Sequence, residues 1–262
     1  LVIKPVDSRG ARGVIRITQS LDLEWVFEYT KSFSPTSRVM VEEFLQGQQY
    51  STESVIMDEK NITMGFTERN YELLEELSPY IIENGGQQPA KIDKKELDSI
   101  VNLVEKSSQI LGISNATSKC DVVMTKEGPK IIEIAPRLSG GYFSSDQIEL
   151  ATGINITEIA IRLSLGEKIN KSKLHFSHQN AVAIRYFFPK PGKITSISNI
   201  DSFKNESWVH KLNLFFRVGD VLEKVTDHTK RCGFVITTGN TRDEAVERAK
   251  TVVENIQILT RQ

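Results

Sequence analysis

The sequence lacks the features of several classes of protein. Its two cysteines, Cys120 and Cys232, fit no C-x-x-C pattern, so neither a disulfide framework nor a cysteine-based zinc site is expected. No apolar run approaches the ~20 residues that span a bilayer, and the first residues do not resemble a signal peptide. With 33 basic and 34 acidic residues, the net charge of −1 gives no long-range attraction to nucleic acid or an acidic membrane. We therefore expect a cytoplasmic protein with neither partner.

Histidine is scarce too, and the common catalytic motifs are missing. The four histidines lie late in the chain without metal-ligand spacing: His175, His178, His210 and His228. No Ser–His–Asp or Cys–His set is evident. No glycine-rich stretch ends in Gly-Lys-Ser or Gly-Lys-Thr, which excludes a Walker A loop. Chemistry through a covalent nucleophile is not indicated.

What the chain does contain is 262 residues in which strand-like and helix-like segments interleave, which predicts an α+β fold. Capping residues indicate four helices, beginning after Ser20, Asp93, Asn155 and Thr241. Strands are expected at 1–4, 14–17, 39–44, 50–57, 120–124, 130–135, 181–188, 194–197, 212–218 and 234–237. Because Leu1 is not a methionine and opens a strand-like run, we expect further residues before it.

A loop at residues 7–13, rich in glycine and charge, follows Lys4 at the end of the first expected strand. A lysine there can reach a phosphate, and glycines let backbone N–H groups approach anionic oxygens closely. The loop contains no large apolar anchor, so it is expected to open at low cost. An ordinary solvated β-turn is the alternative.

Asp121 and Glu133 lie on two strands joined by a short connection. If the loop is the three residues 126–128, these residues pair directly and their Cβ atoms lie roughly 4.5–5.5 Å apart. Two carboxylates at that range repel unless a cation lies between them, and oxygen ligands suit Mg²⁺. A two-residue turn would reverse the parity and turn one carboxylate to solvent. Arg137, just beyond, could hold a carboxylate or phosphate, or form a surface ion pair.

Three segments in this order resemble the ATP-grasp superfamily. "VIKPVDSRGARGV" is similar to its phosphate-binding strand and flexible lid, and "VEEFLQGQQYSTE" to the hinge strand against which adenine and ribose pack. "CDVVMTKEGPKIIEIAPRLSGG" is similar to the metal-binding hairpin. The resemblance implies an ATP-grasp fold, with a lid subdomain and an antiparallel-sheet core.

The downstream part resembles the carboxyl-terminal α/β subdomain of biotin carboxylases and amino-acid ligases, through "AVAIRYFFPKPGKI" and "CGFVITTGNTRDEAVERAKTVVENIQI". This likeness divides the chain into a partial lid (1–41), a core (42–170) and a carboxyl-terminal subdomain (171–262). The family's amino-terminal domain would precede the chain. Arg185 falls on a strand arginine that faces the acyl-acceptor or bicarbonate site, and an ion-pair role is the alternative.

The resemblance also implies site residues, with ATP and Mg²⁺ (or Mn²⁺) as cofactors. Asp121 and Glu133 would hold the metal, while Arg137 and Arg185 would be catalytic. ATP would contact Lys4, Ser8, Arg9, Gly10, Arg12, Gly13, Glu42, Glu43, Phe44, Leu45 and Gln49. Two positions depart from the family pattern: Gln49 replaces a ribose-binding glutamate, and Ala135 replaces a metal-binding asparagine.

The expected activity is that of a ligase that activates a small carboxylate as an acyl phosphate for attack by an amine, with a homodimer as a compatible assembly. Two alternatives remain. One is a carbamoyl-phosphate-synthetase-like or biotin-carboxylase-like enzyme that uses bicarbonate, and the other is a non-catalytic nucleotide-binding module.

Overall fold

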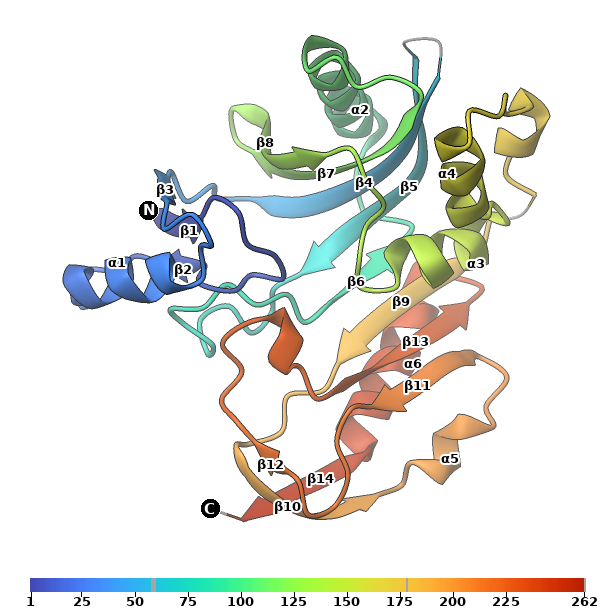
Figure 1. The fold of residues 1–262 in the computed structure, drawn as a ribbon. Helices are drawn as coiled ribbons and strands as arrows, with labels where there is room; N and C mark the ends of the chain where they lie inside the picture. The colour runs from blue at the N-terminus through green and yellow to red at the C-terminus, as the bar shows by residue number, and fades with distance from the viewer. Residues whose placement is uncertain (58–59, 178, 262) are drawn as a thin grey trace.

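The computed structural model describes residues 1–57, 60–177 and 179–261, so His178 lies outside the described residues (Figure 1). Every strand pair in the described part is antiparallel, and helices alternate with the strands, which confirms the predicted α+β class. The strands are β1 (Val2–Pro5), β2 (Ile15–Arg16), β3 (Val39–Glu42), β4 (Gln48–Met57), β5 (Lys60–Asn70), β6 (Gly85–Gln88), β7 (Ala116–Thr125), β8 (Gly128–Ala135), β9 (Ala181–Tyr186), β10 (Gly192–Ser198), β11 (Val209–Leu214), β12 (Val221–Leu222), β13 (Gly233–Gly239) and β14 (Gln257–Arg261). The α-helices are α1 (Leu23–Ser32), α2 (Lys94–Ile110), α3 (Ile148–Thr152), α4 (Ile156–Ser164), α5 (Asp201–Lys204) and α6 (Arg242–Asn255). A π-helix, η1 (Phe143–Gln147), and two 3-10 helices, η2 (Lys171–Leu174) and η3 (His228–Lys230), complete the helical segments of the described residues.

The strands form one large sheet and two small ones. The large sheet has eight strands in the order β11-β13-β9-β6-β5-β4-β7-β8. A three-stranded sheet, β2-β1-β3, lies with α1 at the amino-terminal end, and β12-β10-β14 forms the third sheet at the carboxyl-terminal end (Figure 1). The chain enters the large sheet directly after β3, so residues 43–47 connect the amino-terminal sheet to β4.

Helices cover both faces of the large sheet because successive residues of a strand point to opposite sides. On one face, here called the α6 face, Cys120 packs with Ile100 of α2, and Val235 packs with residues of α6. On the opposite face, here called the metal face, Phe234 packs near Ala151 of α3. Two covered faces give the sheet two hydrophobic cores.

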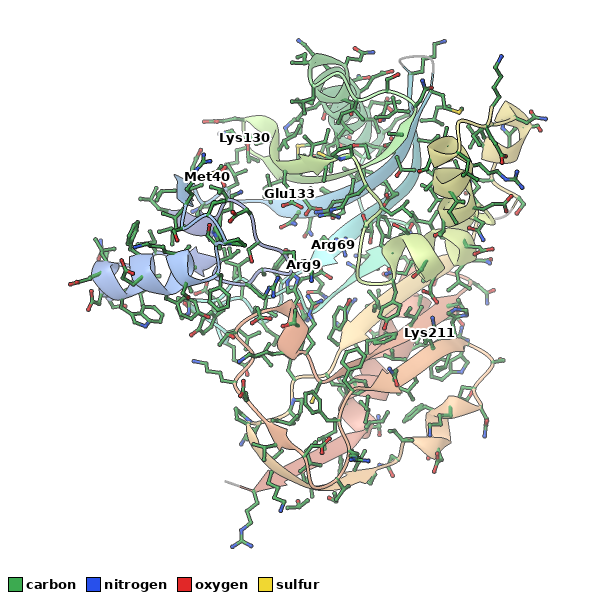
Figure 2. The ribbon with its side chains drawn as sticks, viewed as in Figure 1. Arg9, Met40, Arg69, Lys130, Glu133 and Lys211 are labelled. Carbon is green, nitrogen blue, oxygen red and sulfur yellow. The ribbon has the colours of Figure 1, made fainter. Side chains whose placement is uncertain are left out.

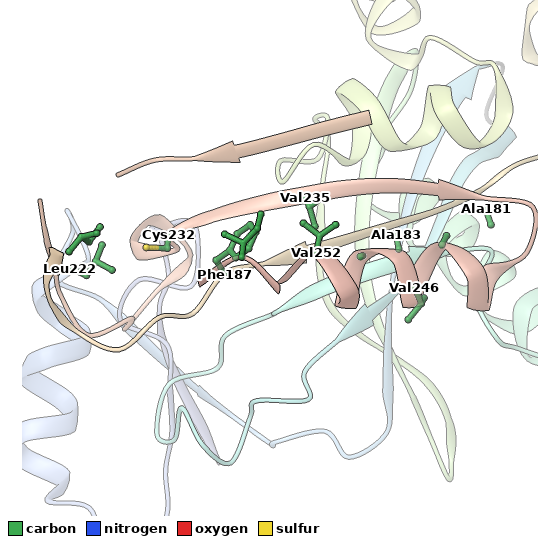
Figure 3. Close-up of a cluster of buried hydrophobic side chains, with 12 residues drawn as sticks. Ala181, Ala183, Phe187, Leu222, Cys232, Val235, Val246 and Val252 are labelled. Carbon is green, nitrogen blue, oxygen red and sulfur yellow. The ribbon is translucent and has the colours of Figure 1, made fainter. Parts of the chain in front are cut away.

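The α6 core shows how the sequence specifies this packing. Small and branched residues recur at helical spacing along α6, namely Ala245, Ala249 and Val252, and all are fully buried. They meet alternate residues of β9 and β13 (Figure 3). Small side chains on the helix let its backbone approach the sheet closely, and each buried valine contributes roughly 1.5–3 kcal/mol.

Three of the four predicted helix caps are confirmed. The side chains of Asp93, Asn155 and Thr241 each accept a hydrogen bond from a backbone N–H of the first turn of α2, α4 and α6. The prediction of Ser20 as the first cap is wrong, since Asp22 caps α1 through the N–H groups of the next turn. A carboxylate is favoured at that position because it also meets the positive end of the helix dipole.

The large sheet runs through the predicted boundary between residues 170 and 171. β6 pairs with β9, so strands on either side of that boundary are hydrogen-bonded neighbours. Four strands, β5, β6, β12 and β14, were not expected from the sequence, and β11 ends at Leu214 instead of continuing to residue 218. Within the described residues, no helix has the length and apolarity that a membrane crossing requires.

Candidate active site

Asp121 of β7 and Glu133 of β8 lie directly opposite each other, as the sequence predicted. The predicted reason is wrong. The turn has two residues, because Thr125 pairs with Gly128, and this register alone would misalign the two acids. A β-bulge between the Asp121 and Val122 pairs inserts one extra residue in β8 and restores the parity. The two carboxylates therefore share the metal face.

A single ammonium group joins these carboxylates. Lys119, two residues before Asp121 on the same face, donates to Asp121 Oδ2 and to Glu133 Oε1. The side chains of Lys119 and Asp121 are 10% and 15% exposed, whereas Glu133 is 49% exposed, so the pair opens to solvent on the Glu133 side. Burial opposes ionisation of Asp121, but Lys119 and Arg69 outweigh it and hold the pKa of its carboxyl below the usual value.

The donor set fits a divalent cation. Two carboxylates converge on one cation position, which the Lys119 ammonium takes, and hard oxygen ligands are those that Mg²⁺ prefers. The described residues include no group of three or more His, Cys, Asp or Glu side chains able to hold a metal. Two protein ligands suit Mg²⁺, which usually keeps several waters and binds substrate phosphates.

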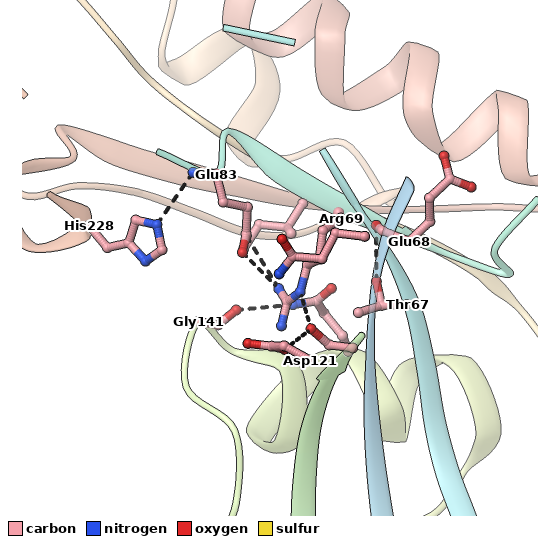
Figure 4. Close-up of polar contacts among 12 residues, drawn as sticks. Thr67, Glu68, Arg69, Glu83, Asp121, Gly141 and His228 are labelled. Atoms are coloured by element: carbon pink, nitrogen blue, oxygen red, sulfur yellow. Dashed lines mark hydrogen bonds and ion pairs between the residues drawn. The ribbon is translucent and has the colours of Figure 1, made fainter. Parts of the chain in front are cut away.

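A series of buried polar contacts runs from Asp121 through Ser51 and Arg69 to Glu83 (Figure 4). Ser51 of β4 donates to Asp121 Oδ1 and accepts from Arg69 Nε at 2.7 Å. Arg69 Nη1 in turn donates to Glu83 Oε1 at 3.2 Å. Neighbouring carboxylates outweigh the effect of burial and raise the pKa of the Arg69 guanidinium. Since each buried charge has a partner, Asp121 is held ionised in one orientation.

Arg137 lies beside this pair, as expected. Its Nη2 is 3.9 Å from Glu133 Oε1, and its side chain is 56% exposed. The segment that follows is held by Glu53, whose Oε2 accepts from Ser139 N at 3.0 Å and Ser144 Oγ at 2.8 Å. Glu53 is fully buried, and burial raises the pKa of its carboxyl. Glu53 thus positions the backbone that carries Arg137.

The loop after β1 is anchored at its start and at its tip, contrary to the expectation that little holds it in place. The carboxylate of Asp7 accepts hydrogen bonds from Ser34 and Thr36, which stabilise its ionised form and lower the pKa of its carboxyl. At the tip, Gly10 O accepts from His228 N of η3 at 2.9 Å. The predicted phosphate-contacting residues of this loop are Ser8, Arg9, Gly10, Arg12 and Gly13. Arg9, Arg69 and Glu133 are labelled in Figure 2.

The predicted adenine-binding segment is less regular than expected. The strand β3 ends at Glu42, whose carboxylate forms an ion pair with Lys4. Phe44 and Leu45 belong to no strand, and no backbone–backbone hydrogen bond joins them to another of the described residues. Arg16 lies over the Phe44 ring, 4.6 Å from its centre. Free N–H and C=O groups beside a covered aromatic ring are what recognition of a purine edge requires.

The remaining predicted residues of this segment lie near the hairpin. Glu43 is 3.6 Å from Lys130 of β8, so the connecting segment touches the hairpin that carries Glu133. Gln49, two residues before Ser51 on β4, shares the metal face.

Arg185 does not join this cluster. It pairs with Val235, which packs against α6, so its side chain lies on the α6 face. Conversely, the sequence did not single out Lys119, Ser51, Arg69 or Glu53. Period-2 spacing from Asp121 could have found Lys119, but Arg69 depends on β5, which was not expected.

Comparisons with known proteins agree with this geometry. The family model "ATP-grasp domain" matches residues 1–141, and the model "L-amino acid ligase C-terminal domain 2" matches residues 185–261. The uncharacterized protein y4rH of Sinorhizobium fredii is 26% identical over 97% of this chain and 52% of its own length. Dapdiamide A synthase of Enterobacter agglomerans is 23% identical over 97% of this chain and 60% of its own. The chain thus spans about half to three-fifths of these relatives. The crystal structure of L-amino acid ligase from Bacillus licheniformis superposes with a TM-score of 0.82 at 18% identity, covering 100% of this chain and 63% of that one.

Proposed function

The chain belongs to the ATP-grasp domain family, and on that premise we propose that it forms the ATP-binding and carboxyl-terminal part of a ligase that joins a carboxylate to an amine. The γ-phosphoryl group of ATP passes to the substrate carboxylate, and the amine attacks the resulting acyl phosphate with loss of phosphate. Such chemistry depends on positioning and charge neutralisation more than on a covalent nucleophile.

The observation that carries the proposal is the convergence of Asp121 and Glu133 on one cation position, with Arg137 beside it. These two carboxylates would hold Mg²⁺, with Mn²⁺ as an alternative. When bound, the metal ion would neutralise the charge of the ATP phosphate oxygens. Arg137, more than half exposed, is free to turn towards a transferring phosphoryl group and bind it through two N–H groups.

The other residues position ATP and exclude water. Lys4 and the backbone N–H groups of the 7–13 loop would bind the phosphates. Phe44 and Leu45 would contact the adenine ring and its edge, and Gln49 would approach the ribose. The contact between Gly10 and His228 supports a closed loop, which would keep water from a hydrolysable acyl phosphate.

Amino acids are the proposed substrates, supported by the match of residues 185–261 to the L-amino acid ligase domain and by the likeness to dapdiamide A synthase. A homodimer and a cytoplasmic location stay predictions.

The test uses the full-length protein with ATP, Mg²⁺ and pairs of amino acids. We expect amino-acid-dependent phosphate release together with a condensed product of the summed mass less one water. ATP consumption stimulated by bicarbonate alone would instead favour the carboxylase-like alternative. No ATP binding in a folded full-length protein would overturn the proposal.

A further inference from the structure

A polar pocket lies on the α6 face of the large sheet, opposite the face that carries Asp121 and Glu133. Its volume is about 460 Å³, and it is bordered by the ends of β4, β5 and β6 and by α6. Charged and amide side chains line it, among them Gln87, Arg185, Arg242, Glu247 and Lys250. Gln49, proposed above to approach the ribose, and Arg69 also border it.

Arg185 is the unusual member of the lining. The residue is 4% exposed, and its guanidinium donates to neutral groups: Gly86 O at 3.3 Å, Ile184 O at 2.9 Å and Gln87 Oε1 at 2.9 Å. Its Nε has no hydrogen-bond partner, and no carboxylate in the described part of the chain forms an ion pair with it. Burial, the largest influence, lowers the pKa of Arg185. A buried cation is ordinarily paired, so this one favours an anion in the pocket.

One neighbouring carboxylate, that of Glu68, has both oxygens engaged by other groups. Glu68 Oε1 accepts from Gln87 Nε2 and from Arg242 Nη2, both at 2.8 Å. Its Oε2 accepts from the backbone N–H of Lys91, also at 2.8 Å. Arg242 is similarly occupied, since it also pairs with Asp243 at 3.0 Å. These bonds engage both carboxylate oxygens of Glu68, so Glu68 forms no direct ion pair with Arg185 among the described residues.

The carboxylate whose charge acts most strongly on Arg185 is that of Glu72, although the two form no ion pair in the described part of the chain. Glu72, with a side chain 54% exposed, is 3.7 Å from Lys250, and Glu247 is exposed one turn before Lys250 on α6. The pocket therefore has a buried guanidinium inside and carboxylates at its mouth. A ligand with a carboxylate at one end and an ammonium at the other complements this order of charges.

We propose that this pocket binds a small zwitterionic carboxylate, an α-amino acid or a short peptide, with its carboxylate towards Arg185 and its ammonium towards Glu72 and Glu247. Asp121, Glu133 and Arg137 do not line this pocket. It can therefore hold the same class of molecule that the ligase would consume or produce, away from the carboxylates proposed to bind the metal.

Hydrogen exchange of the full-length protein can locate the ligand. We expect L-alanine or L-alanyl-L-alanine to slow exchange across residues 242–250 and 68–72, and the two ligands distinguish an amino acid from a peptide. Propionate lacks the ammonium and alaninamide lacks the carboxylate, so both should bind more weakly, by roughly tenfold for each lost charge-assisted contact. The protection should persist in E133Q, which alters only the metal face.

Two variants test the roles of the charges. Arg185→Met should abolish the protection while leaving the ligand-free protein as stable as before or more so, because the unpaired buried charge is gone. Glu247 is exposed, so Glu247→Gln should not disturb folding. This variant should bind L-alanine several-fold more weakly and bind propionate with unchanged affinity. Absence of protection across 242–250 at any ligand concentration, or its survival in the Arg185→Met protein, would overturn the proposal.

Discussion

The carbonyl oxygen of Gly10 accepts a hydrogen bond from the backbone N–H of His228 at 2.9 Å, which joins the amino-terminal loop to the last part of the chain. The same histidine accepts a bond through Nε2 from the N–H of Glu83 at 3.3 Å. Glu83 pairs with Arg69, which leads to Asp121 through Ser51. The position of the loop is therefore linked to the side chains that hold the metal site.

Replacing Gly10 tests this loop. Its φ of +67° is left-handed, so Gly10→Ala should cost about 1 kcal/mol locally and raise the KM for ATP several-fold in the full-length protein. Gly112→Ala is the matched control, because Gly112 has the same φ and an added Cβ meets nothing within 4 Å. Steady-state kinetics measure both, and equal KM values in the two variants would remove the loop from ATP binding.

Glu133→Gln keeps the shape of the side chain and removes its charge. We expect ATP turnover to fall at least ~100-fold and Mn²⁺ affinity, measured by electron paramagnetic resonance, to fall by ~10-fold or more. Glu127→Gln is the control, since this exposed acid lies in the turn of the same hairpin and pairs only with Lys130 in the described residues. Unchanged metal affinity in Glu133→Gln would exclude Glu133 as a ligand.

Lys119→Met removes the ammonium between Asp121 and Glu133. The two carboxylates then repel, and the free energy of unfolding without metal should drop by roughly 3 kcal/mol. Mg²⁺ should restore more of that stability in the variant than it adds to the wild type. Thermal unfolding with and without Mg²⁺ measures the difference, with Lys130→Met as the surface control. The same response to Mg²⁺ in all three proteins would contradict the idea that Lys119 stands at the cation position.

His228 predicts a pH dependence of stability. Burial, reinforced by Arg231 and Arg69, holds the pKa of this imidazole well below its usual value, so it is neutral when folded. In the unfolded chain the imidazole has a pKa near 6.5, so below that pH it takes up a proton that the folded protein does not bind. The free energy of unfolding therefore falls as pH drops below about 6.5, by up to about 1.4 kcal/mol per pH unit. His228→Gln keeps an acceptor for Glu83 N and should flatten this loss in urea unfolding between pH 7 and 5. His175 is exposed, so His175→Gln should leave the pH dependence of the unfolding free energy as it is. An unchanged pH dependence in His228→Gln would assign the loss of stability to other groups.

The sequence predicted that Asp121 and Glu133 pair, but it did not predict the backbone geometry that aligns them. Direct pairing of Asp121 and Glu133 follows from alternation along two strands, and it is correct. The number of residues in the turn and the bulge beyond it compensate each other, and a single sequence carries no signal for a bulge in "PKIIEIA". The prediction placed one residue too many in the turn and omitted the bulge, and these two errors cancel in the pairing of Asp121 with Glu133.

The orientation of Arg185 shows why part of the site could not be predicted. Residues 181–187 are nearly continuously apolar, because helices cover both faces of the sheet and all seven residues are buried. Without alternation, the pattern does not show which face each side chain takes. The resemblance supplied a role for Arg185, but the packing of Val235 and Ala183 against α6 decides its face.

The pairing of β6 with β9 has a consequence for how the chain folds. These neighbours are separated by nearly a hundred residues, so the large sheet closes only after most of the polypeptide has been synthesised. A fragment that stopped at residue 170 would expose the β6 edge, a ready template for pairing with other chains. The two halves of the sheet should therefore be obtained in soluble form by co-expression, each supplying the strand that protects the other from aggregation.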